Sequence, residues 1–207
     1  MSNKFRTYLI WLMLGILPSV GMGQSVPVQT HQYSIEVAGV RVGRLTAQRQ
    51  PTGADEYTDT LISDVEVNLL LYRVRVYYKV VNRFKGTQLI QSAVDARTNR
   101  GTFGSRTTWT GERYLIRADQ YKYHRQAIED APIDFTVTHL YFQEPQEQPR
   151  AYGEYFGDFF RLVRSGPGRY RATFQQAEDE YQYERQQLVR VTKRNKIAPF
   201  VIRRISE

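Results

Sequence analysis

Apolar and polar residues alternate along most of the chain after Pro27. In the clearest stretch, from Leu70 to Val80, every second residue is aliphatic or aromatic, and Arg73 and Arg75 lie between such residues. Successive side chains of a strand point to opposite faces of the sheet. The period therefore predicts a β-strand with one buried face and one face in water.

Turn residues divide the alternating segments into hairpins. Gly39 separates the apolar positions of 33–37 from those of 40–48, and Ser165–Gly168 separates two further β-rich runs. Because glycine, proline and serine are favoured in tight turns, each pair predicts a β-hairpin. Including these hairpins, strands are predicted over 33–37, 40–48, 70–80, 87–97, 102–110, 114–116, 135–141, 159–164, 169–174, 180–184, 188–193 and 200–205.

One segment, Ala151–Val163, has aromatic residues at helical spacing, but it contains Gly153 and Gly157. Each interior glycine costs a helix about 1 kcal/mol relative to alanine, so we expect an aromatic loop or a single turn there. Without helices, parallel strands cannot be connected in the usual way. The chain is therefore predicted to be all-β, with a single antiparallel, strongly curved sheet or open β-barrel of about ten strands.

The first residues have a different pattern. Lys4 and Arg6 precede an apolar run from Tyr8 to Leu17, and small residues follow up to Gly23. A basic start, a short apolar run and small residues are typical of a secretory signal peptide, and the run is too short for a membrane helix. We predict a cleaved signal peptide over 1–23 and a single β-barrel-like domain over 24–207. The mature protein would be exported, periplasmic or secreted, with no transmembrane helix.

The amino-acid composition limits which kinds of site and partner the protein can have. The chain has no cysteine, which excludes disulfides, thiolate metal sites and a lipid anchor on a cysteine. Its formal net charge is +8. Export argues against nucleic acid as the partner of this charge. Arginine matches phosphate and carboxylate geometry, so a lipid headgroup or an acidic glycan of the cell envelope is the expected partner. The 15 tyrosines and 10 phenylalanines suit an acyl chain or a sugar face.

Candidate catalytic and metal-binding residues are sparse. His31, His124 and His139 are far apart in the sequence and lack the close spacing of a metal site. His139 lies on the predicted strand 135–141 and is expected in the core or an interface, whereas His31 is expected in solvent. No Gly-x-Ser-x-Gly motif occurs. We therefore predict no catalytic, cofactor-binding or metal-binding residue and no cofactor, and the ligand-binding residues stay unassigned.

Three acids near aromatic rings keep a glycoside hydrolase open as an alternative. Glu144 and Glu154 flank a loop, and Asp158 follows them. Such enzymes need two carboxyl groups about 5–9.5 Å apart. With 21 acids in the chain, neighbourhoods of this kind arise by chance.

Several short segments stand out along the mature chain: Tyr33–Ile35, Gly39–Gly43, His139–Pro145, Gly168–Arg171 and Tyr181–Glu184. In this order they resemble a group of exported bacterial domain-of-unknown-function families, well represented in Bacteroidota. The resemblance implies an open antiparallel β-barrel, distantly similar to the periplasmic lipoprotein-carrier fold, whose half-barrel cradles acyl chains. It implies no catalytic residues. The chain departs from the expected Asn-Gly turn at Arg185–Gln187.

These patterns lead to one functional expectation. The protein is predicted to be an exported envelope protein that acts as a non-catalytic binding or structural module for an apolar or amphiphilic ligand. The alternatives are a carbohydrate-acting hydrolase and a small outer-membrane barrel, which 184 mature residues are long enough to form.

Overall fold

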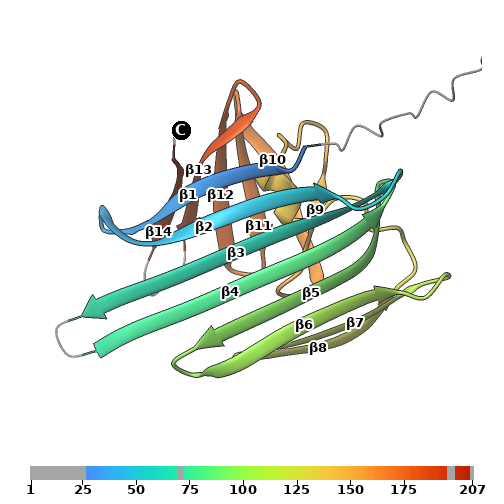
Figure 1. The fold of residues 1–207 in the computed structure, drawn as a ribbon, viewed down its shortest axis with the longest axis horizontal. Helices are drawn as coiled ribbons and strands as arrows, with labels where there is room; N and C mark the ends of the chain where they lie inside the picture. Colours follow the sequence, from blue (N-terminus) through green and yellow to red (C-terminus); the bar gives the residue numbers. More distant parts are fainter. Residues whose placement is uncertain (1–26, 70–71, 195–198, 206–207) are drawn as a thin grey trace, which may run out of the picture.

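The computed structural model describes residues 27–69, 72–194 and 199–205. The predicted signal peptide over 1–23 and Leu70, at the start of the predicted long strand, lie outside the described residues. The described chain forms one antiparallel sheet of 14 strands (Figure 1). No helix in this part of the chain is long and apolar enough to cross a membrane.

The strands of the first half are β1 Gln29–Val37, β2 Val40–Pro51, β3 Glu56–Leu69, β4 Tyr72–Lys85, β5 Gln88–Thr98, β6 Gly101–Trp109, β7 Tyr114–Gln120 and β8 Tyr123–Glu129. A 3₁₀ turn, η1 Thr138–Tyr141, follows. The remaining strands are β9 Arg150–Gly153, β10 Asp158–Gly166, β11 Arg169–Phe174, β12 Ala177–Glu184, β13 Gln187–Arg194 and β14 Phe200–Arg204.

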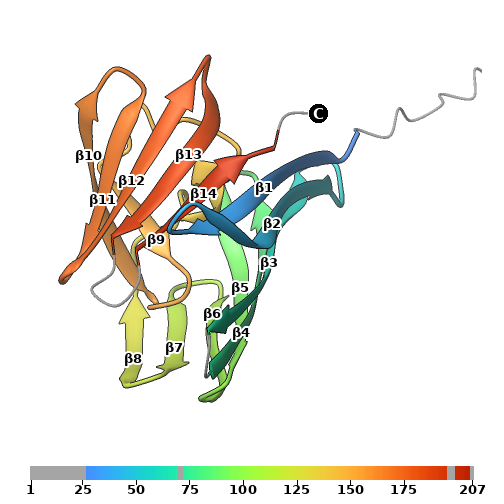
Figure 2. The ribbon, with the colours of Figure 1, turned by 90° about the vertical axis from the view of Figure 1, so that its left-hand side faces the viewer.

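Most strands pair with their neighbours in the sequence, and β14 is the exception. The order across the sheet is β8-β7-β6-β5-β4-β3-β2-β1-β14-β13-β12-β11-β10-β9. The fourteenth strand is therefore inserted between the first strand and the thirteenth, and it joins two runs of consecutive hairpins. In Figure 2, β1–β5 and β10–β13 lie on opposite sides of the molecule.

The expectation of a strongly curved sheet or open barrel of about ten strands is wrong in two respects. The sheet has 14 strands, and it is neither closed nor strongly curled. A barrel closes only when its edge strands pair with each other. Here β8 and β9 are the two edges, and within the described residues each is hydrogen-bonded to a single neighbouring strand.

Residues 130–149 connect β8 to β9 in the sequence and run over the inner face of the sheet. This is the face on which Tyr33, Leu61 and Val80 are buried. We call this connection the crossing segment. The crossing segment accepts a hydrogen bond from Leu89 N of β5 at Ile133 O, 2.8 Å. Further along, hydroxyl groups from opposite sides of the molecule donate to it: Tyr33 of β1 to Tyr141 O, 3.2 Å, and Tyr183 of β12 to Leu140 O, 2.7 Å.

The strand predicted over 135–141 is also wrong, because this part of the crossing segment is a single bridge followed by a turn. Thr136 forms an isolated parallel bridge with Tyr152 of β9. The chain then turns through η1, where the His139 ring accepts the Thr136 N–H, 3.1 Å. That bond closes the turn and directs His139 into the core, where only 3% of the residue is exposed.

Over Ala151–Val163 the expected absence of a helix is confirmed. Two strands, β9 and β10, flank a tight turn in which Gly157 N donates to Gly153 O, 2.9 Å. A Cβ on Gly157 would lie 2.6 Å from Ile116 of β7. The glycine therefore lets the turn approach β7 on the inner face.

One core joins both halves of the sheet. Buried side chains from β1–β5, from the crossing segment and from β9–β14 form a single cluster, so the space between the halves is filled. Its fully or almost fully buried members include Tyr33, Ala47, Val80, Val94, Leu140, Ala151, Ala172, Tyr181, Leu188 and Val191.

Candidate functional site

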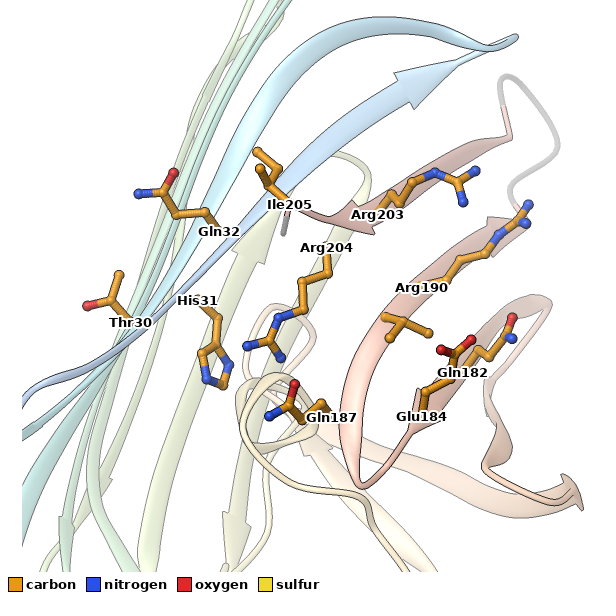
Figure 3. A pocket seen from close by; sticks show the side chains of 11 residues that line it. Thr30, His31, Gln32, Gln182, Glu184, Gln187, Arg190, Arg203, Arg204 and Ile205 are labelled. Carbon is orange, nitrogen blue, oxygen red and sulfur yellow. The ribbon is translucent and has the colours of Figure 1, made fainter. Parts of the chain in front are cut away.

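A groove of about 560 Å³ lies where β14 ends, between β1 and β13 (Figure 3). β14 has 5 residues, whereas β1 has 9 and β13 has 8. The pairing of Tyr33 with Arg204 is the last between β1 and β14. Beyond it, the first residues of β1 and of β13 have no strand between them. The gap is lined by Thr30, His31, Gln32, Gln182, Glu184, Gln187, Val189, Arg190, Arg203, Arg204 and Ile205.

Three arginines give the groove its charge. Arg190 and Arg203 are paired across β13 and β14 and point to the same face, whereas Arg204, the next residue, points to the inner face beside Tyr33. Figure 3 shows Arg204 directed toward His31 and Gln187, with Arg190 and Arg203 on the other side. Among the described residues, Glu184 is the only acid in the lining. The groove is therefore positive and is reached by guanidinium groups from both faces.

Two of these arginines are incompletely paired. Arg190 Nε and Arg204 Nη1 are buried and have no hydrogen-bond partner among the described residues. Arg203 differs, because its Nε lies 3.5 Å from Glu36 Oε1. Arg204 is paired with Tyr33 across β14 and β1. Burial raises the pKa of Tyr33, and the positive charge of Arg204 opposes the rise. A buried N–H without an acceptor costs about 1–3 kcal/mol, more when the group is charged, and an anion in the groove would remove that cost.

A second cluster, the polar row, crosses five strands of the inner face. Directly paired residues of β2 to β6 form it: Arg49, Asp59, Asn82, Ser92 and Thr107. All except Arg49 are buried. Such a row is unusual on a buried face, because buried polar groups need hydrogen-bond partners.

Partners for part of the polar row come from β9, from the β9–β10 turn and from the crossing segment, where Thr136 Oγ1 accepts from Asn82, 3.5 Å. Asn82 donates to Glu154 Oε1, 2.8 Å, and the hydroxyls of Thr107 and Tyr152 are 2.6 Å apart. Asp59 receives a bidentate pair from Arg49, 2.6 and 2.7 Å. Among the described residues, Ser92 Oγ has no partner and Asn82 Oδ1 has none.

His139 lies against this row as a neutral side chain. Its Nδ1 accepts the Thr136 N–H, so Nε2 carries the ring hydrogen and donates to Tyr57 Oη, 3.0 Å. Burial and the nearby Arg49 charge lower the pKa of His139 to about 3. A histidine with this pKa is not matched to general-base chemistry near neutral pH. The hydrogen bonds of the polar row and of the neighbouring His139 therefore hold the crossing segment against the inner face of the sheet.

The three histidines have separate surroundings. His31, expected in solvent, is instead half-buried: its Nδ1 is 2.9 Å from Tyr141 O, since the crossing segment passes beside β1. His124 is exposed and is 2.6 Å from Asp119. His139 is in the core, as expected. Among the described residues no group of three or more His, Asp or Glu could hold a metal ion.

The three acids considered for hydrolysis each have a local partner. Glu144 accepts a hydrogen bond from Tyr170, 2.7 Å, and Glu154 is buried against Asn82. Asp158 lies 3.3 Å from Arg125. None of the three lines the groove.

Sequence reasoning missed the groove, although one signal was present. Arg203 and Arg204 are consecutive in a predicted strand, so they place charge on both of its faces. A strand that is paired on both sides and covered on its inner face can carry an inward-pointing arginine only where a gap lies beside it. That gap depends on which strands flank β14, and the pattern along the chain does not contain this information.

Comparison with family models found one match: a domain of unknown function, DUF6134, covers residues 33–205. Neither the curated proteins nor the solved structures gave a match.

Proposed function

The chain belongs to the DUF6134 family, and we propose that it is an exported, non-catalytic module of the cell envelope that binds the anionic group of an amphiphile in the groove at the end of β14. The observation that supports the proposal best is the pair of buried guanidinium nitrogens, on Arg190 and Arg204, that have no partner among the described residues.

The size and lining of the groove agree with such a ligand. Sites for small molecules usually measure about 300–1,000 Å³, and this groove measures about 560 Å³. Val189 and Ile205 add apolar surface beside the arginines. A phosphate or carboxylate would be held by the guanidinium groups, with the first part of an apolar chain against these two residues.

We propose that the ligand lies in the groove and not between the halves of the sheet. In the carrier fold that the sequence resembles, the inner face cradles acyl chains. Here core side chains and the crossing segment fill that space. The likeness to those carriers therefore supports the compartment and the amphiphilic ligand class more than the position of the ligand.

Binding is tested with soluble probes of matched chain length. Dihexanoyl phosphatidylglycerol, dihexanoyl phosphatidylcholine and oligogalacturonate would be titrated into residues 24–207 by calorimetry. We expect saturable binding of the phosphatidylglycerol and no binding of the zwitterionic lipid. Binding of the oligogalacturonate in place of the phosphatidylglycerol would assign the groove to an acidic glycan and overturn the amphiphile. A ligand at 100 times its Kd should stabilise the fold by about 2.7 kcal/mol.

Arg204→Gln is the decisive variant, with Arg117→Gln as its matched control on an exposed site of β7. Losing a charge-assisted hydrogen bond should raise the Kd at least about tenfold. Arg204 Nη1 has no hydrogen-bond partner among the described residues, so its removal leaves no acceptor unpaired there. Thermal unfolding of Arg204→Gln checks that the fold is retained. Equal binding by both variants, or no binding of any probe, would exclude the groove as the site.

The proposed export is tested by the mass of the mature protein. Export with cleavage between Gly23 and Gln24 would give an intact mass for residues 24–207 in protein purified from its native envelope. A mature protein that begins at Met1 would remove export from the proposal.

A further inference from the structure

The β5–β6 and β7–β8 turns lie at the same end of the sheet (Figure 1), on strands that do not line the groove. Together with the adjoining parts of β3 and β4 they carry a second set of cations. The turn between β5 and β6 holds its neighbour through Asn99, which accepts the Arg75 N–H and donates to Arg73 O, both 2.7 Å. On its other side, the Arg100 guanidinium lies 4.9 Å from the centre of the Tyr121 ring, in the β7–β8 turn. The two turns and the adjoining parts of β3 and β4 therefore make one continuous surface. We call it the basic end, and its cations are Arg73, Arg75, Arg97, Arg100 and Lys122.

Positive charge exceeds negative charge on the basic end. Arg73 and Arg75 share one acid, Glu66, whose pKa they lower. Within the described residues, Arg97 and Arg100 have no acidic partner, and Lys122 has none. Unpaired cations on neighbouring turns repel one another, so a negatively charged partner that contacts all of them is favoured.

An aromatic ring holds two of these cations together. Lys122 Nζ lies 5.4 Å from the centre of the Tyr121 ring, on which Arg100 also rests. Tyr121 is itself 42% exposed and contacts Phe103, with 6.0 Å between ring centres. Exposed tyrosine beside arginine and lysine suits the headgroup region of a membrane, where amphipathic rings and cations both gather.

We propose that the basic end docks this protein onto the anionic surface of a phospholipid bilayer. Arg73 and Arg75 contact Glu66, whereas Arg100 and Lys122 contact the Tyr121 ring. Cations in two such groups match a plane of many phosphates better than a single small anion. The surface as defined excludes Leu70 and Leu71, which join β3 to β4 in the sequence and lie outside the described residues. The bilayer docking does not depend on the groove.

Vesicle co-sedimentation tests the docking. Residues 24–207 would be mixed with vesicles of phosphatidylcholine alone or of phosphatidylcholine with roughly one-third phosphatidylglycerol, at low and at physiological salt. We expect binding to the anionic vesicles only, and weaker binding at higher salt because exposed charges are screened.

The test variant is Arg100→Gln with Lys122→Asn. Lys122 has a φ of 59°, a left-handed conformation that asparagine adopts more readily than lysine, so the fold should be retained. Each cation removed near an anionic surface should weaken vesicle binding about fivefold. Arg161→Gln with Arg169→Gln removes the same charge from exposed sites on β10 and β11 and should have little effect.

Arg204→Gln separates this docking from the groove, because it should lower probe binding there and leave vesicle binding intact. Equal vesicle binding by the Arg100/Lys122 variant and the parent would overturn the proposal. So would sedimentation with polygalacturonate but not with anionic vesicles, which would assign the basic end to an acidic polysaccharide.

Discussion

Arg49 connects the polar row to the outside, because its side chain is 22% exposed while its partner Asp59 is fully buried. The guanidinium lies between the rings of Tyr57 and Phe142, 4.7 and 4.6 Å from their centres. Burial raises the pKa of Asp59, and the bidentate pair with Arg49 opposes the rise. The row therefore holds one ion pair whose acid has no access to water and whose base is fixed by stacking.

His139 makes the stability of the fold depend on pH. Its pKa is about 3 in the folded protein, against about 6.5 in an unfolded chain. Below pH 6.5 the unfolded chain therefore binds a proton that the folded chain does not. The free energy of unfolding should fall as pH falls from about 6.5 toward 3, by up to about 1.4 kcal/mol per pH unit.

Urea unfolding of the parent and of His139→Gln between about pH 7 and pH 4 measures this effect. The raised pKa of Asp59 acts with the opposite sign at the lower end of the range, so the difference between the two proteins is the useful quantity. The variant should have the shallower dependence on pH. Parallel curves would mean that the pKa of His139 is the same in the folded and the unfolded chain.

The turn between β12 and β13 stores strain that can be removed. Arg185 and Gln186 have φ values of 49° and 64°, so both central residues are left-handed, as a type I′ turn requires. Asparagine and glycine tolerate this conformation, whereas other residues pay about 1 kcal/mol or more each. The departure from Asn-Gly in the sequence is therefore a change of residue and not of turn type.

Arg185→Asn with Gln186→Gly should raise the free energy of unfolding by about 1–2 kcal/mol. Thermal and urea unfolding would measure the gain. Ala38→Asn tests the same effect in the β1–β2 turn. Ala38 has a φ of 50° before Gly39, so this variant should also stabilise the protein. A loss of stability in the double variant would mean that Arg185 or Gln186 makes a contact that offsets the strain.

Hairpins with a strong turn signal were predictable. At β10–β11 the turn needs Gly168, whose φ is 61° and whose Cβ would lie 2.4 Å from Tyr183 O. The sequence shows such a glycine directly. In contrast, β3 was missed because its inner face carries Asp59 and Ser63 among apolar residues. The charge of Asp59 is met by Arg49 of the neighbouring strand, a pairing that the alternation along the chain does not show.

The crossing segment shows the other limit of sequence reasoning. Residues 135–141 alternate as a strand would, yet the His139 side chain closes a turn there. The turn also contacts Tyr57 of β3 and Tyr183 of β12, which are far away in the sequence. The groove has the same origin, since it exists only because β14 is short and is placed between two longer strands. Local pattern determines strands and turns, whereas these two features depend on which strands meet.

The two halves of the molecule are joined in the sheet by β14 alone. This strand pairs with β1 on one side and with β13 on the other, and its Ile202 is 3% exposed. A chain shortened to residues 24–198 lacks the strand, whereas one shortened to 24–205 keeps it. We expect the shorter chain to lose its cooperative thermal transition, followed by circular dichroism, and the longer chain to keep it. A cooperative transition in both would mean that the core between the halves suffices without β14.

The position of β14 also sets the order of events as the chain is made. A growing chain that has emerged as far as residue 194 contains every strand except the one that joins β1 to β13. Until residues 200–204 follow, the backbone edges of β1 and β13 stay open to any extended segment, including another copy's β14. At high expression, exchange of the β14 strand between newly made chains is the misassembly to which this topology is most open.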